Sequence, residues 1–204
     1  MAILPVNATR MELNKLKIRL TTTRKGHKLL KNKVDGLLKE FLAISKKTIL
    51  LKKEIKEKIK YVNIYLKLAA TYSSKEMVDL ALENKTKPIN IKVLNDSILG
   101  VLKPSFLVEE KIDPADFLNY SFFSNSYYLD LAIKQQTKLN FKLIELSEAE
   151  KTILILAEEI KKTRRKVNAI ENILIPNFND TIKYISLKLD ENERSTIARL
   201  NRIK

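Results

Sequence analysis

The chain has no cysteine and no tryptophan, and only one histidine, three glycines and five prolines among its 204 residues. Without cysteine it has neither a disulfide framework nor thiolate ligands, and His27 alone cannot build a zinc cluster. The three glycines do not form the phosphate-binding pattern G-x-x-x-x-G-K-[ST]. We therefore expect no catalytic residues, no cofactor and no metal. The scarcity of glycine and proline favours a mostly helical chain.

Long apolar runs are also absent. None approaches the roughly 18 to 20 residues that a membrane-spanning helix needs. The first residues, Met-Ala-Ile-Leu-Pro, lack the charged and long apolar regions of a signal peptide. Carboxylates are abundant, but they lie among lysines at the i,i+4 spacing of solvated helix surfaces. We expect a cytoplasmic chain that is not an enzyme and does not insert directly into a membrane.

Positive charge is what the chain has in excess, with a net charge of +15. Such a surface favours acidic partners, which include nucleic acid, anionic membranes and acidic protein cavities. Lysine greatly outnumbers arginine, which weakens the case for nucleic acid because base and phosphate recognition favours the arginine fork. A solvated helix surface also explains the charge, so charge alone leaves the partner open.

Two heptad patterns of about 75 residues each frame a short middle segment. The first runs through Leu13, Leu16, Leu20, Thr23, His27, Leu30, Val34, Leu37, Phe41, Ile44, Thr48, Leu51 and Ile55. The second runs through Leu139, Leu143, Leu146, Ile153, Leu156, Ile160, Val167, Ile170, Leu174, Ile182, Ile185 and Leu189. Such spacing keeps one apolar stripe against a single partner helix. The sequence predicts an all-α fold, a long antiparallel two-helix coiled coil with a short β-hairpin and loop at the connecting end, each arm roughly 110 Å long.

We expect a single elongated domain, 1–204, with a helix over about 9–84, a hairpin and loop over about 86–125, and a helix over about 126–200. Thr9 and Glu12 have the spacing of a capping box, and Ser124 or Ser126 can cap the second helix. Between the helices, Ile89–Val93 and Ile98–Leu102 flank the turn signal Asn95-Asp96 and predict the hairpin.

Gly36 and Pro176 are the positions at which we expect the coil to bend. Glycine weakens a helix by about 1 kcal/mol relative to alanine, and proline removes a backbone hydrogen bond, so a kink is expected near Ile175. If the antiparallel pairing of the two long helices is centred near residue 105, Gly36 falls roughly opposite Pro176. The same pairing brings Lys46 and Lys47 beside the basic residues of segment 161–166.

Several motifs resemble the D subunit of rotary V/A-type ATPases. They are Thr-Arg-Met-Glu-Leu at 9–13, Arg-Lys-Gly-His-Lys-Leu-Leu-Lys at 24–31 and Lys-Thr-Arg-Arg-Lys-Val-Asn-Ala at 162–169. Ile175-Pro176 and the segments 182–185 and 187–191 continue the resemblance, which covers both helices almost end to end. The connector, about 86–125, matches only in kind, and Gly36 replaces the acidic residue expected after Asp35.

The resemblance implies a central-stalk subunit, the rotor shaft of a proton- or sodium-translocating ATPase that couples ATP hydrolysis or synthesis to rotation. In that family the paired chain ends enter the cavity of a hexamer of catalytic and non-catalytic subunits. The hairpin end points toward the membrane rotor through a funnel-shaped adaptor, and the small F subunit of the stalk binds the lower part of the coil. The complex is membrane-bound, and this subunit is a peripheral, cytoplasmic part of it.

Candidate contact residues follow from the resemblance and the charge pattern. The candidates for hexamer contact are Arg10, Lys46, Lys47, Lys162, Arg164, Arg165, Lys166 and Arg199. The candidates for a partner at the hairpin end are Ile98, Val101, Tyr120, Phe122 and Phe123. The alternative is a basic coiled-coil nucleic-acid-binding or scaffold protein. A nucleic-acid binder would have arginine-rich stripes with interleaved aromatics, which this sequence lacks, so we expect no specific nucleic acid.

Overall fold

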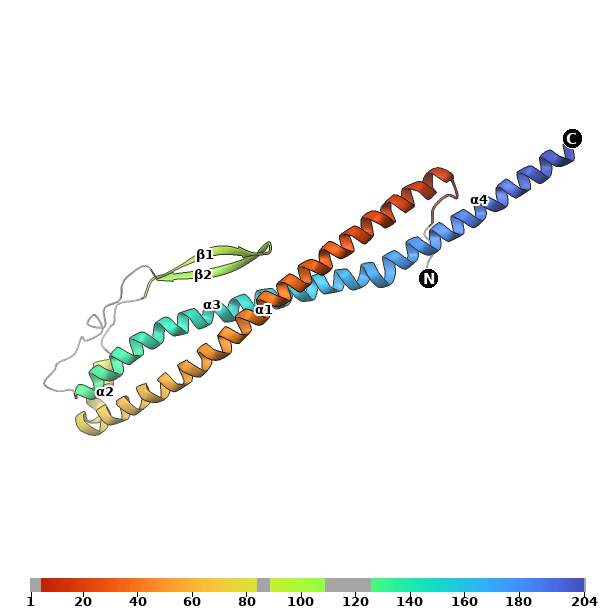
Figure 1. Cartoon of the computed structure of the whole chain (residues 1–204). Coiled ribbons are helices and arrows are strands. Elements are labelled where there is room, and N and C mark those ends of the chain that lie inside the picture. Colours follow the sequence, from red (N-terminus) through yellow and green to blue (C-terminus); the bar gives the residue numbers. More distant parts are fainter. Residues whose placement is uncertain (1–4, 84–88, 109–125, 204) are drawn as a thin grey trace. The chain divides into compact units, whose positions relative to one another are not determined.

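The computed structural model describes residues 5–83, 89–108 and 126–203. In chain order the elements are α1 (Arg10–Ser73), α2 (Lys75–Glu83), β1 (Ile91–Ile98), β2 (Val101–Val108), α3 (Tyr127–Ala169), η2 (Ile170–Leu174) and α4 (Ile175–Ile203) (Figure 1). Long helices with one antiparallel hairpin confirm the predicted fold class. The predicted end of the first helix at 85–88 lies outside the described residues, as do Tyr120, Phe122 and Phe123.

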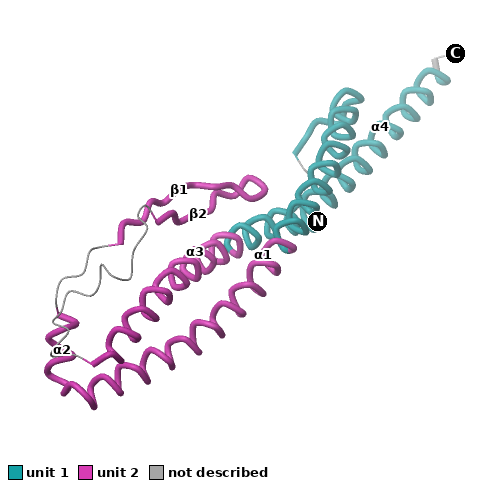
Figure 2. The backbone as a smooth tube through the Cα atoms, turned by 60° about the vertical axis from the view of Figure 1, so that its left-hand side comes forward, with its two compact units in different colours: residues 1–38, 158–204 teal, residues 39–157 magenta. Residues whose placement is uncertain are grey.

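The chain divides into two compact units (Figure 2). Unit 1 comprises residues 1–38 and 158–204, and in it the first part of α1 pairs with the end of α3, with η2 and with α4. Unit 2 comprises residues 39–157 and holds the rest of α1, α2, the hairpin and the first part of α3. Both units therefore contain a pair of antiparallel helices, and only unit 2 also contains strands among its described residues.

Side-chain caps begin both long helices. The Thr9 hydroxyl oxygen accepts a hydrogen bond from the Glu12 backbone N–H at 3.2 Å, which confirms the predicted cap. The reciprocal half of the capping box does not form, because the Glu12 carboxylate pairs with Lys15 at 2.8 Å. At α3 the Ser126 hydroxyl accepts from the Tyr128 N–H at 3.3 Å, so Ser126 is the cap of the second helix.

The first helix breaks at Ser74 and does not continue to residue 84 as predicted. Ser74 has a φ of 62°, in the left-handed region that ends an α-helix. Beyond it, α2 buries Val78 and Ala81 in a core cluster with Ala69 and Leu129. No glycine or proline marks this break in the sequence, so local propensity favoured a continuous helix and tertiary packing overrides it.

The hairpin turns at Leu99 and Gly100, not at the predicted Asn95-Asp96. Both turn residues have positive φ, 50° and 78°, as a two-residue type I′ turn requires, and glycine adopts such angles without steric cost. Asn95 and Asp96 lie inside β1, where they pair with Pro104 and Lys103 of β2. The strands are therefore longer than the sequence pattern predicted.

The seam between the paired helices follows the predicted heptads and also contains threonine. Every predicted seam residue of α1 is buried or half-buried, and Leu37 has no exposed surface. Five threonines are buried as well: Thr48, Thr137, Thr152, Thr163 and Thr181. Four of these hydroxyls donate to the carbonyl oxygen four residues earlier, which are the bonds of Thr48, Thr137, Thr152 and Thr181. A threonine satisfied in this way can occupy an apolar seam.

A wide helical turn, η2, changes the phase of the second helix just before Pro176. The Ile175 N–H donates to the carbonyl of Ile170, five residues earlier. The wider turn carries Leu174 out of the seam, where it is 43% exposed, and brings in the half-buried Ile175. The prediction that Leu174 belongs to the seam is therefore wrong. The expected bends at Gly36 and Pro176 stay predictions.

Candidate functional site

The helices of unit 1 pair in a different register from the predicted one. Nε2 of His27 lies 3.3 Å from a carboxylate oxygen of Glu171. A cavity of about 320 Å³ is lined by Lys31, Val34, Asp35, Leu38, Ile160, Arg164, Val167, Asn168 and Glu171. The neighbours of Gly36 thus face Ile160 and Arg164, not Pro176. Helix α1 ends at Ser73 and α3 begins at Tyr127, so the antiparallel pairing of the two helices is centred near residue 100 and not near 105.

This register separates the lysines and arginines that we expected to form one basic belt. Nζ of Lys47 lies 2.9 Å from Glu145 in unit 2, and this contact raises the pKa of Lys47. Arg164, by contrast, lines the cavity of unit 1. The prediction that Lys46 and Lys47 lie beside segment 161–166 is therefore wrong.

The basic segment of α3 lies on the outside of the helix pair in unit 1. Thr163 and Val167 of this segment are buried in the seam. The four predicted contact cations around them are exposed: Lys162, Arg164, Arg165 and Lys166. The surface of α3 here presents positive charge to solvent, and the seam residues hold it in place.

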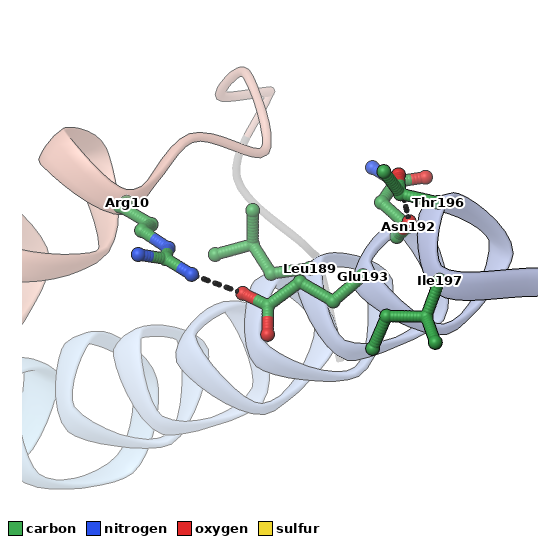
Figure 3. A pocket seen from close by; sticks show the side chains of 6 residues that line it. All are labelled: Arg10, Leu189, Asn192, Glu193, Thr196 and Ile197. Atoms are coloured by element: carbon green, nitrogen blue, oxygen red, sulfur yellow. Dashed lines mark hydrogen bonds and ion pairs between the residues drawn. The ribbon is translucent and has the colours of Figure 1, made fainter. Parts of the chain in front are cut away.

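At the end of unit 1, Arg10 and Glu193 join the start of α1 to α4 (Figure 3). Their side chains meet at 2.5 Å, and the carboxylate raises the pKa of Arg10. They line a cavity of about 380 Å³ together with Leu189, Asn192, Thr196 and Ile197. Helix α1 begins at Arg10, whereas α4 continues past Glu193 to Ile203, so the last residues of α4 have no part of α1 beside them. That last segment exposes Leu200 and the predicted contact residue Arg199.

Positive charge is concentrated in unit 1. Its sequence has 20 Lys and Arg against 9 Asp and Glu, a net charge of +11. Unit 2 has 19 Lys and Arg against 15 Asp and Glu, a net charge of +4 over a longer stretch of chain. The excess of positive charge is therefore larger in the unit that contains both chain ends.

Ion pairs cross between the helices of unit 2. In addition to Lys47 and Glu145, Lys52 meets Glu150 at 2.7 Å, and Lys142 contacts Glu54. The last contact lowers the pKa of Glu54 and raises that of Lys142. These partners lie about 90 to 100 residues apart in the sequence, so no local spacing could have predicted them.

The hairpin of unit 2 is attached to α3 by a backbone-to-carboxylate bond. The Phe106 N–H of β2 donates to Glu148 at 3.0 Å. Of the predicted partner residues, Val101 is buried and Ile98 is half-buried. The hairpin exposes other apolar side chains, which the sequence analysis missed: Val93, Leu94, Leu99, Leu102 and Leu107. Which side chains of the hairpin are exposed depends on the strand register, and the predicted turn at Asn95-Asp96 implied a different register.

Two kinds of site are missing from the residues that the structure describes. Across 5–83, 89–108 and 126–203, no helix is long and apolar enough to cross a membrane. The same ranges hold no cluster of three or more histidine, cysteine or acidic side chains that could bind a metal ion.

The family model for the D subunit of ATP synthase matches residues 12–204. The V-type ATP synthase D subunit from Acetivibrio thermocellus is 42% identical over 205 residues, covering 100% of this chain and 92% of the relative. One from Clostridium botulinum is 41% identical over 203 residues, covering 98% of this chain and 94% of the relative. One from a Thermoanaerobacter species is 39% identical over 204 residues, covering 100% and 97%.

These matches extend over both units and both long helices. They agree with the absence of a nucleotide loop from the sequence and with the paired-helix architecture. The D subunit of a V-type ATP synthase is a non-catalytic stalk subunit of a membrane-associated complex. The chain belongs to the ATP synthase D-subunit family.

Proposed function

We propose that this chain is the central-stalk rotor shaft of a V/A-type proton- or sodium-translocating ATPase. It couples ATP hydrolysis or synthesis in the catalytic hexamer to rotation of the membrane rotor. The observation that carries this proposal is the uneven charge, a net +11 on the unit that contains both chain ends against +4 on the other. A basic shaft suits a cavity that presents acidic groups, because the attraction persists in every rotational position.

The proposed partners are those that the resemblance to the D-subunit family implies. Unit 1 enters the hexamer of catalytic and non-catalytic subunits, with Arg10, Lys162, Arg164, Arg165, Lys166 and Arg199 as contact residues. Lys46 and Lys47 lie in unit 2, where Lys47 already has a carboxylate partner, so their role in hexamer contact is smaller. The hairpin end, with Ile98, Val101, Tyr120, Phe122 and Phe123, faces the funnel-shaped adaptor, and the small F subunit of the stalk binds the coil nearby.

The whole chain works as a single elongated domain on the cytoplasmic side of the membrane complex, without inserting into the bilayer. Gly36 and Pro176 are the positions where it bends during rotation. Individual contacts with the hexamer are weak, since exposed ion pairs contribute about 0 to 1 kcal/mol. Weak contacts suit a shaft, which must exchange partners with each step.

The decisive experiment is reconstitution of the ATPase with and without this chain. We expect ATP hydrolysis by the hexamer to be coupled to ion transport only when the chain is present. Transport that proceeds at the same rate in its absence would refute the shaft proposal.

A binding assay with duplex DNA tests the nucleic-acid alternative, which the basic surface of unit 1 favours. We expect only non-specific binding, with a Kd of about 10⁻⁴ to 10⁻⁶ M at physiological salt. Sub-micromolar, sequence-dependent binding that is lost in the Arg164→Glu/Arg165→Glu variant would favour the alternative.

A further inference from the structure

The part of α1 in unit 2 carries five lysines at a strict seven-residue spacing. This lysine row consists of Lys39, Lys46, Lys53, Lys60 and Lys67. Seven residues make nearly two turns, so neighbours in the row lie about 10.5 Å apart and drift by only about 20° around the helix. All five are exposed, whereas the seam residues Leu51, Ile55 and Val62 of the same helix are buried. The row therefore lies on the side of α1 opposite the seam.

The charges of the lysine row are not neutralised within the described structure. The described ion pairs of unit 2 involve other lysines: Lys47, Lys52, Lys103 and Lys142. Carboxylates one turn away on α1 are few: Asp35 lies one turn from Lys39, Glu57 lies one turn from both Lys53 and Lys60, and Lys46 and Lys67 have none. The ion pairs that join α1 to α3 in unit 2 use Lys47, Lys52 and Lys142, so the lysine row is a separate feature of the surface.

Apolar side chains are interleaved with the lysine row on the same face. Leu42, Ile49 and Ile64 lie one turn from row lysines and are 56%, 55% and 51% exposed. Phosphate groups would neutralise the lysines but offer nothing to these side chains. A bilayer would require the apolar side chains to form a face of their own, apart from the cations. A protein surface can meet both kinds of side chain at once.

We propose that this face of α1 docks an acidic protein helix whose carboxylates recur at about 10 Å along its length and whose apolar side chains contact Leu42, Ile49 and Ile64. The match is one of charge and of period. An α-helix with Asp or Glu at every seventh position repeats its carboxylates at the spacing of the row.

A cavity on the flank of the row gives the docked helix a place to anchor. It has a volume of about 350 Å³ and is lined by Glu54, Glu57, Lys58, Tyr61, Tyr65 and Gln135. Burial, together with the nearby charge of Lys142, lowers the pKa of Lys58. Because Glu54 and Glu57 also line this cavity and would repel a carboxylate, the anchor is an apolar side chain of the docked helix, which would pack against the rings of Tyr61 and Tyr65.

The first test measures binding of the full chain to a synthetic helical peptide with Glu at every seventh position and Leu one turn from each Glu. The row variant is Lys46→Gln/Lys53→Gln/Lys60→Gln. The matched control is Lys75→Gln/Lys134→Gln/Lys151→Gln, which removes the same charge from exposed positions of unit 2.

We expect the row variant to bind the peptide about tenfold more weakly, since three modest contacts are lost together, and the control to stay within about twofold of the original chain. Both variants should keep their helical circular dichroism. Equal losses in the two variants, or no binding by the original chain, would overturn the proposal. So would tighter row-dependent binding of a 20-base-pair DNA duplex or of phosphatidylserine vesicles.

The second test uses the purified ATPase and rests on the proposed function. A water-soluble carbodiimide couples lysine amines to carboxylates in direct contact, so row lysines should couple to a neighbouring protein of the complex. If the chain is present in the ATPase and its row lysines remain uncoupled, the docking proposal fails while the shaft proposal stands. If the chain is missing from the ATPase, the shaft proposal fails and the peptide assay alone decides the docking proposal.

Discussion

Units 1 and 2 use the same kind of seam but treat charge differently. Both bury Leu and Thr between two antiparallel helices. Unit 2 balances most of its cations and adds cross-helix ion pairs, a core cluster around Ala69 and a hairpin attached by Glu148. Unit 1 keeps a large positive excess. Both units also have cross-helix polar contacts, which in unit 1 join Arg10 to Glu193 and His27 to Glu171, so the difference between the units is in net charge and not in how the helices pair.

The largest expected effect tests whether both units depend on the seam. Leu37 of unit 1 and Leu156 of unit 2 are seam residues that are 0% and 1% exposed. Leu37→Asp or Leu156→Asp places an unpaired carboxylate in the seam, and we expect each to cost about 3 kcal/mol or more of unfolding free energy. Chemical denaturation followed by circular dichroism measures this cost. The exposed control Lys28→Asp should cost little, and a similar loss at all three positions would contradict the assigned seam.

A smaller effect is expected where the hairpin attaches in unit 2. Glu148→Ala removes the acceptor of the Phe106 N–H. A hydrogen bond to a charged group contributes about 1.5 to 3 kcal/mol, so local opening of β2 should become easier by a comparable amount. Hydrogen exchange at the Phe106 amide reports this directly. Glu150→Ala, which removes an equal charge from the same helix, should leave that amide protected; fast exchange in both variants would argue against the attachment.

The charge difference between the units is tested at the hexamer. Arg164→Glu/Arg165→Glu in unit 1 should weaken binding of the stalk to the hexamer by about 2 kcal/mol or less, with the loss shrinking as salt rises. Titration of labelled chain into the hexamer at two ionic strengths measures it. Lys134→Glu/Lys151→Glu makes the same charge change on unit 2 and should have little effect. Equal weakening would mean that total charge matters and its position does not.

The smallest effect concerns the pH dependence of one ion pair in unit 2. Lys142 lowers the pKa of Glu54 from its ordinary value of 4.5, so the folded state favours the ionised carboxylate. The stability from this pair is present at neutral pH and is lost as the pH falls through the lowered pKa. Glu54→Gln should therefore melt slightly below the original chain at pH 7, and the two should converge in strong acid. Glu40→Gln, at an exposed position, should match the original chain throughout.

The sequence was sufficient to predict the paired helices because their evidence is local and repeated. Each heptad adds another residue to the same stripe, and Thr9 and Ser126 mark the helix starts with short-range caps. The pairing register was harder, because it depends on where the helices end. The break at Ser74 has no glycine or proline signal, and the resulting shift of the centre moved Lys47 away from segment 161–166.

The candidate site was predicted only in part for a similar reason. Exposed cations such as Arg164 and Arg165 can be recognised from heptad positions, since they flank a buried residue. Glu148 and Glu145 become important only through contacts with residues distant in sequence. The exposure of the apolar side chains of the hairpin follows from the turn at Leu99-Gly100. The sequence signal for a turn is stronger at Asn95-Asp96, so the turn was predicted there.

The wide turn at η2 has a consequence for where the seam can move. A wide turn can migrate along a helix when the next N–H takes over the bond to the carbonyl five residues earlier. The residue after Ile175 is Pro176, which has no N–H to donate. The proline therefore acts as a stop that prevents the wide turn from advancing into α4. It thereby fixes which side of α4 each residue after Pro176 occupies, so Thr181 and Ile185 stay buried while Leu187 and Leu200 are exposed.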